Sequence, residues 1–81
     1  MVNGKNSILA RHKFDYSRLR GLIREKFGTE KAFAEAMKME PTNLSRRFRL
    51  CSFTISEINR VCALLSIAEK DIPTFFFTKL E

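Results

Sequence analysis

The sequence has few of the residues on which enzyme and metal sites depend. It contains one histidine, two cysteines, three glycines and no tryptophan. A structural zinc site needs four ligands at paired close spacings, which His12, Cys51 and Cys62 do not supply. The chain also lacks a glycine-rich phosphate loop and a carboxylate pair placed for acid–base chemistry. We therefore expect neither an enzyme nor a bound cofactor or metal.

Long apolar runs are missing as well. The longest, Val61–Leu65, is far shorter than a membrane span. Residues 8–10 form an apolar stretch that is too brief for the core of a signal peptide. We expect a soluble protein of the cytoplasm that does not contact a membrane.

Positive charge is plentiful and is concentrated in one part of the chain. Residues 1–49 hold 12 lysines and arginines against 5 acidic residues, whereas residues 50–81 hold 3 against 4. A basic half joined to a near-neutral half indicates a polyanionic partner on one side of the molecule. A solvated surface that only keeps the protein soluble is the alternative.

The apolar spacing predicts an all-α fold of five short helices in a single domain, residues 14–81, after a flexible basic arm, residues 1–13. Asp15 and Thr29 are candidate N-caps, and Gly28 suits the end of the first helix. Thr54 and Glu57 match a capping box. The predicted helices cover residues 15–27, 30–37, 41–48 and 54–65, with a last helical segment in 66–77 that is broken near Pro73.

The predicted third helix, residues 41–48, has one apolar face and one polar, basic face. Successive helical residues turn by roughly 100°, so that if Leu44 and Phe48 are buried, Thr42 and Arg46 point away from the core. Small polar residues near its start would let the helix backbone approach a surface closely. Arginine can donate two hydrogen bonds to guanine or to a phosphate. This composition favours a helix that lies in the DNA major groove, although many such basic faces bind nothing.

The segment "TEKAFAEAMKMEPTNLSRRFRL", residues 29–50, resembles the helix-turn-helix of the Cro and phage-repressor group, the lambda-repressor-like or XRE-type family. Ala34 falls at the small position where the two helices cross, and Leu44 at the apolar anchor of the second helix. The resemblance extends over residues 14–77. This region is similar to small prophage repressor-like proteins of Gram-positive bacteria. Two positions depart from the pattern: Lys38 stands where glycine is common at the turn, and Glu40 where serine or threonine usually caps.

The resemblance implies a sequence-specific regulator that binds double-stranded DNA, encoded by a phage or prophage. Residues 41–48 would read the major groove, and the second helix would direct its N-terminus at a phosphate. Contacts to bases or the groove wall are expected from Pro41, Thr42, Ser45, Arg46 and Arg49. Phosphate contacts are expected from Thr29, Glu30, Lys31, Asn43, Arg47, Ser52 and Thr54.

The aromatic segment near the C-terminus predicts a second copy as a partner. Phe75, Phe76 and Phe77 point in different directions on a helix, and one small domain can hardly bury all three. At least one is therefore expected to contact another copy, and a homodimer suits a two-fold symmetric operator. The basic arm, residues 1–13, could follow a groove of the DNA or could be a disordered terminus.

The alternative function is a protein-interaction module. An antirepressor or inhibitor could keep the helix-turn-helix fold while contacting a regulatory protein instead of DNA, because a fold does not fix a function. Glu40 at the edge of the expected groove contact favours this alternative, as do the exposed aromatics. The sequence leaves open the operator, the choice between repression and activation, and any controlling ligand.

Overall fold

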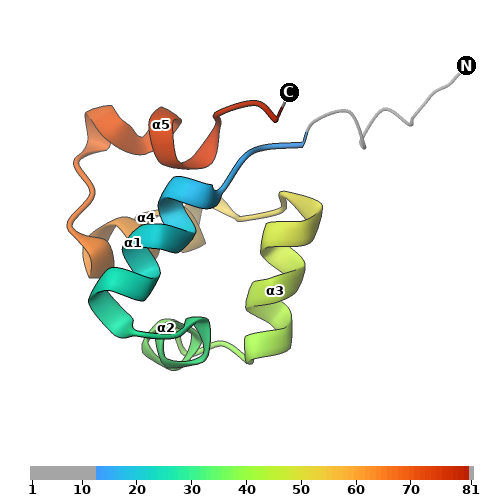
Figure 1. The fold of residues 1–81 in the computed structure, drawn as a ribbon, viewed down its shortest axis with the longest axis vertical. Helices are drawn as coiled ribbons and strands as arrows, with labels where there is room; N and C mark the ends of the chain where they lie inside the picture. The colour runs from blue at the N-terminus through green and yellow to red at the C-terminus, as the bar shows by residue number, and fades with distance from the viewer. Residues whose placement is uncertain (1–12, 81) are drawn as a thin grey trace, which may run out of the picture.

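Five α-helices and one short 3-10 helix make up the part of the chain that the structure describes, residues 13–80 of a computed structural model (Figure 1). No strand forms within these residues, and their only β-pairing is a single antiparallel bridge between Phe14 and Lys79. The prediction of an all-α fold with five helices is confirmed. The elements are α1 (Ser17–Phe27), α2 (Glu30–Met37), α3 (Pro41–Leu50), α4 (Ile55–Leu65), η2 (Glu69–Asp71) and α5 (Ile72–Phe76).

α1 lies at the centre of the fold and packs against α2, α4 and α5, whereas α3 lies at one side and packs mainly against α2 (Figure 1). The apolar spacing of each helix explains this arrangement, because it turns one face of every helix inward. The predicted anchors of α3, Leu44 and Phe48, are both buried. The core consists of Tyr16, Leu19, Ile23, Phe33, Ala34, Met37, Leu44, Phe48, Ile58, Val61, Leu65, Ile67 and Phe76.

An aromatic cluster joins α3 to α1 and α5. The rings of Tyr16 and Phe48 meet edge to face with centroids 5.3 Å apart, and Phe53 meets Phe48 at 5.2 Å and Phe76 at 5.6 Å. Edge-to-face pairs of this kind are favourable beyond the apolar area that they bury. This cluster therefore fixes the C-terminal half of α3 against the centre of the fold.

The predicted helix ends are largely confirmed. The Thr29 hydroxyl accepts a hydrogen bond from the Ala32 N–H at 3.0 Å, and Thr54 and Glu57 form the complete capping box. Gly28 ends α1 with a φ of 84°. The first helix begins later than predicted, at Ser17, but Asp15 still accepts a hydrogen bond from the first helical N–H, at 2.9 Å.

Three other helices end in a left-handed residue that is not glycine. Lys38, Cys51 and Ser66 close α2, α3 and α4 with φ of 60°, 53° and 58°. The left-handed conformation places Cβ close to the following carbonyl and costs roughly 1–2 kcal/mol per residue. Lys38, which stands where glycine is common in the family, therefore adopts the conformation that favours glycine, and the same conformation recurs at the ends of two other helices.

The third helix runs further than expected, since α3 continues to Leu50, two residues beyond the predicted end. The break expected near Pro73 is present, because the 3-10 helix η2 is followed by the α-helix α5 at Ile72. Pro73 itself lies in the first turn of α5, where the N–H that proline lacks would have no partner.

The two ends of the described chain pair with each other, which the apolar pattern does not predict. The Asp15 N–H donates to the Thr78 carbonyl at 2.7 Å, and the Leu80 N–H donates to the Lys13 carbonyl at 3.2 Å. Figure 1 shows this entry segment and the C-terminal tail next to each other, close to the end of α3.

Candidate functional site

The five residues expected to contact bases or the groove wall lie together on the outer face of α3. All five are exposed, and they line one shallow hollow, which we call the α3 hollow. The buried side chains of Leu44 and Phe48 hold the opposite face of the helix against the core. The sequence therefore identified a continuous surface. The residues of the α3 hollow are Pro41, Thr42, Ser45, Arg46 and Arg49.

The α3 hollow is lined by small side chains near the N-terminus of the helix and by arginines further along. Pro41 is at the first helical position, where its missing N–H leaves no partner unsatisfied. The hydroxyls of Thr42 and Ser45 can donate or accept hydrogen bonds, while the guanidinium groups of Arg46 and Arg49 only donate. Such a surface can hydrogen-bond base edges, phosphates or the carboxylates of another protein.

The N-terminus of α2 is formed as predicted but is partly engaged within the chain. Thr29 uses its hydroxyl as the helix cap, and the Glu30 carboxylate lies 3.4 Å from the Arg20 Nε. Lys31 is exposed. The predicted phosphate contacts at Thr29, Glu30 and Lys31 stay predictions.

Arg47 lies on the core side of α3 and has a partner within the chain. Its Nε donates to both carboxylate oxygens of Glu57, at 2.9 and 3.1 Å, so that α3 is tied to α4. Burial by itself raises the pKa of Glu57, but hydrogen bonds from Arg47 and the Thr54 N–H outweigh it and hold this pKa below its usual value. The Nε of Arg47 is therefore already hydrogen-bonded within the chain. Asn43, the other residue of α3 predicted to contact a phosphate, has an exposed side chain.

Ser52 and Thr54 lie in the connection between α3 and α4. Both are exposed. The Ser52 N–H donates to the Arg47 carbonyl at 3.1 Å, and the Thr54 hydroxyl accepts from the Glu57 N–H at 3.1 Å. The backbone of this loop is therefore fixed, and its predicted role as a phosphate clamp stays a prediction.

The three phenylalanines of the C-terminal segment have different surroundings. Phe76 is 1% exposed and belongs to the core, so that its candidacy as a dimer contact is corrected: its ring is already packed within the monomer. Phe75 is half-buried against the core. Phe77 is 48% exposed, and the centroid of its ring lies 5.5 Å from that of Phe14 and 6.4 Å from that of Phe76. Phe75 and Phe77 remain candidates.

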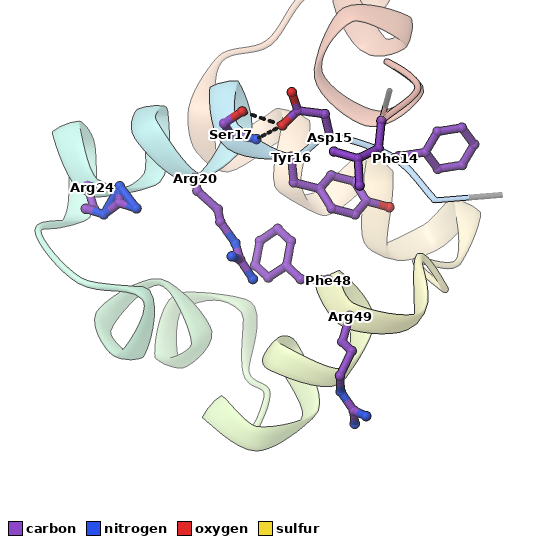
Figure 2. A pocket seen from close by; sticks show the side chains of 9 residues that line it. Phe14, Asp15, Tyr16, Ser17, Arg20, Arg24, Phe48 and Arg49 are labelled. Carbon is purple, nitrogen blue, oxygen red and sulfur yellow. Dashed lines mark hydrogen bonds between the residues drawn. The ribbon is translucent and has the colours of Figure 1, made fainter. Parts of the chain in front are cut away.

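A second hollow, which the sequence did not reveal, lies between α1 and α3 (Figure 2). We call it the α1–α3 hollow. The guanidinium of Arg20 lies over the ring of Phe48, with its central carbon 4.4 Å from the ring centroid. No local spacing predicts the hollow, because its two walls come from helices that are distant in the sequence. The residues that line it are Phe14, Asp15, Tyr16, Ser17, Arg20, Arg24, Phe48, Arg49 and Leu80.

The two cysteines are free and partly buried. Cys51 ends α3, and its Sγ accepts a hydrogen bond from the Phe14 N–H at 3.4 Å. Burial raises the pKa of the Cys62 thiol.

Residues 13–80 contain no group of three or more metal-ligating side chains and no helix that is long and apolar enough to cross a bilayer. The arm predicted for residues 1–13 lies, except for Lys13, outside the described residues.

Comparisons with known proteins give a similar solved structure and a matching family. The chain is similar to the solution structure of the modulator of repression of the temperate bacteriophage TP901-1 from Lactococcus lactis, with 32% sequence identity and a TM-score of 0.71. The match covers 89% of this chain and 93% of the phage protein. No curated protein sequence matches the chain. A family of proteins of unknown function, DUF739, matches residues 12–79, and the chain belongs to this family.

Proposed function

We propose that this protein is a sequence-specific DNA-binding regulator of transcription, of the Cro and XRE helix-turn-helix type. In this proposal α2 and α3 form the helix-turn-helix, and α3 enters the major groove. The observation that carries it is the α3 hollow, because the residues that the motif assigns to bases all line one exposed surface. The protein has no catalytic role in this proposal and acts in the cytoplasm of a bacterium that carries a phage or prophage.

The roles of the residues follow from their chemistry and position. Arg46, exposed near the middle of α3, reads guanine through paired hydrogen bonds to N7 and O6. Thr42 and Ser45 let the helix approach closely and read neighbouring base edges. Arg49 reaches a base or a phosphate further along the groove, and the N-terminus of α2 lies against the backbone.

A dimer is the proposed binding unit. Phe77 is 48% exposed, so that its ring offers apolar area to a second copy. Two copies would place their α3 helices on half-sites about 34–36 Å apart. Sedimentation at high micromolar concentration should show a dimer in the presence of the operator, and a monomer both free and on DNA would remove this part of the proposal.

The decisive experiment is selection of duplexes from a random DNA pool at about 0.15 M salt, followed by a salt titration of the best duplex. We expect a two-fold symmetric sequence to be enriched, with an affinity that falls steeply as salt increases. Enrichment of nothing, or equal salt-sensitive binding to every sequence, would contradict sequence-specific recognition.

A second candidate function is an antirepressor that acts on another regulatory protein. The solved structure to which the chain is similar is called a modulator of repression, and a protein can modulate repression by binding a repressor. The exposed Glu40 at the start of α3, which forms no side-chain cap, also suits a protein partner better than a phosphate backbone. Tight binding to a repressor from the same phage genome, combined with weak and sequence-independent DNA binding, would favour this candidate.

A further inference from the structure

The α1–α3 hollow has a cationic wall and an apolar wall. Figure 2 shows Arg20 extending from α1 across the ring of Phe48, with Arg24 one turn further along α1. Phe14 and Leu80 contribute apolar surface to the same hollow, and the Leu80 side chain is 57% exposed. Arg49 borders both this hollow and the α3 hollow.

The stacking of Arg20 prepares its guanidinium for a bidentate contact. Its Nε side faces Glu30, 3.4 Å away, in an ion pair that lacks hydrogen-bond geometry. The guanidinium lies over the ring of Phe48, and its two terminal nitrogens have no hydrogen-bond or ion-pair partner within the described residues. A planar group that is already held in place loses less conformational freedom when it binds a carboxylate.

The negative charges near the hollow are already engaged. Asp15, its one acidic lining residue, accepts hydrogen bonds from the N–H and the hydroxyl of Ser17, which lower the pKa of its carboxyl group. Figure 2 shows this pair at the rim, turned away from Arg20. Arg24 and Arg49 form no ion pair with any residue of the described chain. The hollow therefore presents cationic donors to an incoming group.

We propose that the α1–α3 hollow binds an acidic segment of a protein partner, in which a carboxylate pairs with Arg20 and Arg24 while a neighbouring apolar side chain packs against Phe14 and Leu80. The apolar wall favours a protein segment over a nucleic acid, because a phosphate is strongly hydrated and gains nothing from contact with these side chains. The proposal does not depend on whether α3 binds DNA, since the four residues that would hold the segment line the α1–α3 hollow and not the α3 hollow; Arg49 borders both.

Peptide selection on the intact protein tests the proposal. We would select binders from a display library of random short peptides, then titrate the best peptide and its counterpart with every Asp and Glu replaced by Asn and Gln. We expect enrichment of peptides in which an acidic residue adjoins an aromatic or aliphatic one, with the amide counterpart bound at least about tenfold more weakly. In spectra of the labelled protein, the side-chain signals of Arg20 and Arg24 should move.

Variants then locate the site. Arg20→Gln and Arg24→Gln should each weaken the selected peptide by about tenfold. Arg20→Lys should recover only part of this loss, because lysine keeps the charge without the planar pair of donors. Arg18→Gln is the matched control, since Arg18 is exposed on the same helix and lines neither hollow, and it should bind as the unmodified protein does. Thermal unfolding of each variant confirms that the fold is kept.

Several outcomes would overturn the proposal. They are enrichment of no acidic peptide, equal affinity for the amide counterpart, and equal weakening by Arg18→Gln. Duplex DNA provides the last test: if it moves the Arg20 and Arg24 signals and displaces the peptide, and if Arg20→Gln weakens binding to every duplex alike, the hollow binds phosphate. If DNA moves only the signals of the α3 hollow, the two surfaces have separate partners, as proposed.

Discussion

The rest of the molecule holds the two ends of α3 to very different degrees. At the C-terminal end, the Phe48 ring is buried, Arg47 pairs with Glu57, and the Cys51 Sγ accepts a hydrogen bond from the Phe14 N–H. These contacts come from α1, from α4 and from the segment that precedes α1. The last turn of α3 is therefore fixed from three directions.

The N-terminal end of α3 packs against α2, but no side-chain hydrogen bond or ion pair within the described residues joins it to the rest of the molecule. Pro41, Thr42 and Asn43 are exposed, and Glu40 contributes only its backbone carbonyl to the first turn. Leu44, 1% exposed, is the anchor of this half.

The difference shows how a small domain can keep a surface free for a partner. A recognition surface needs a fixed position, but its own polar groups have to stay unpaired until the partner arrives. Fixing one end of a helix through packing satisfies both needs, because the helix is rigid over three turns. The α3 hollow lies on the exposed face of the helix, opposite the buried Leu44 and Phe48, and the α1–α3 hollow lies among the supporting contacts. Four substitutions test this comparison.

Phe48→Ala should have the largest effect on stability, because it removes the buried ring that anchors the C-terminal end of α3. Phe48 is 4% exposed, and it contacts Tyr16, Phe53 and Arg20. Replacing a buried phenylalanine by alanine costs about 3–5 kcal/mol, a large part of the stability of a small domain. Urea unfolding followed by circular dichroism measures the loss. Leu50→Ala, at a position 57% exposed on the same helix, is the control and should change stability by less than about 0.5 kcal/mol.

Arg46→Ala tests the exposed face of α3 and should change binding rather than folding. Arg46 is exposed and forms no ion pair within the described residues, so that the unfolding midpoint should stay the same. If α3 reads DNA as proposed, the variant should lose about 1–3 kcal/mol on the best duplex and relax the preference at one base pair. Competition binding with single-base variants of the selected duplex measures both effects. Unchanged affinity and unchanged preference would show that the proposed orientation of α3 is wrong.

The sequence predicted the α3 surface better than the contacts that support it. Helix caps and apolar spacing depend on residues a few positions apart, so that Thr29, Thr54 and Leu44 could be assigned their roles from local patterns. The same spacing fixed which side of α3 faces outward. The exposed Arg46 follows from this assignment.

Contacts between distant segments could not be read in this way. The pairing of Arg47 with Glu57 depends on how α3 packs near α4, and the stacking of Arg20 on Phe48 depends on how α1 passes α3. The burial of Phe76 is a further case, because three consecutive phenylalanines do not indicate which one points inward. Each of these features is set by tertiary packing.

Glu57→Gln weakens the contact between Arg47, at the C-terminal end of α3, and α4. The size of its effect on stability should depend on pH. In the folded protein, hydrogen bonds from Arg47 and from the Thr54 N–H hold the pKa of Glu57 below its ordinary value of 4.5. The carboxylate therefore contributes stability that is fully present well above pH 4.5 and is lost as the pH falls through the folded pKa. We expect the unmodified protein to be more stable than the variant at pH 7, and the difference to shrink below about pH 4.5. Denaturant unfolding of both proteins across this range is the measurement, and a difference that persists unchanged in acid would contradict the role of the charge.

Lys38→Gly should have the smallest effect, and it should raise stability rather than lower it, because it relieves strain at the turn between α2 and the N-terminal end of α3. Lys38 has a φ of 60° and a ψ of 43°, and its side chain is exposed. Glycine adopts this conformation freely, but it also gives the unfolded chain more freedom, so that the net gain should be no more than about 1 kcal/mol. Lys38→Ala is the matched control: it removes the same charge but keeps Cβ, and it should leave the midpoint of thermal unfolding nearly unchanged. If both variants raise the midpoint equally, the lysine charge is the cause, and if only glycine raises it, the cause is the left-handed turn.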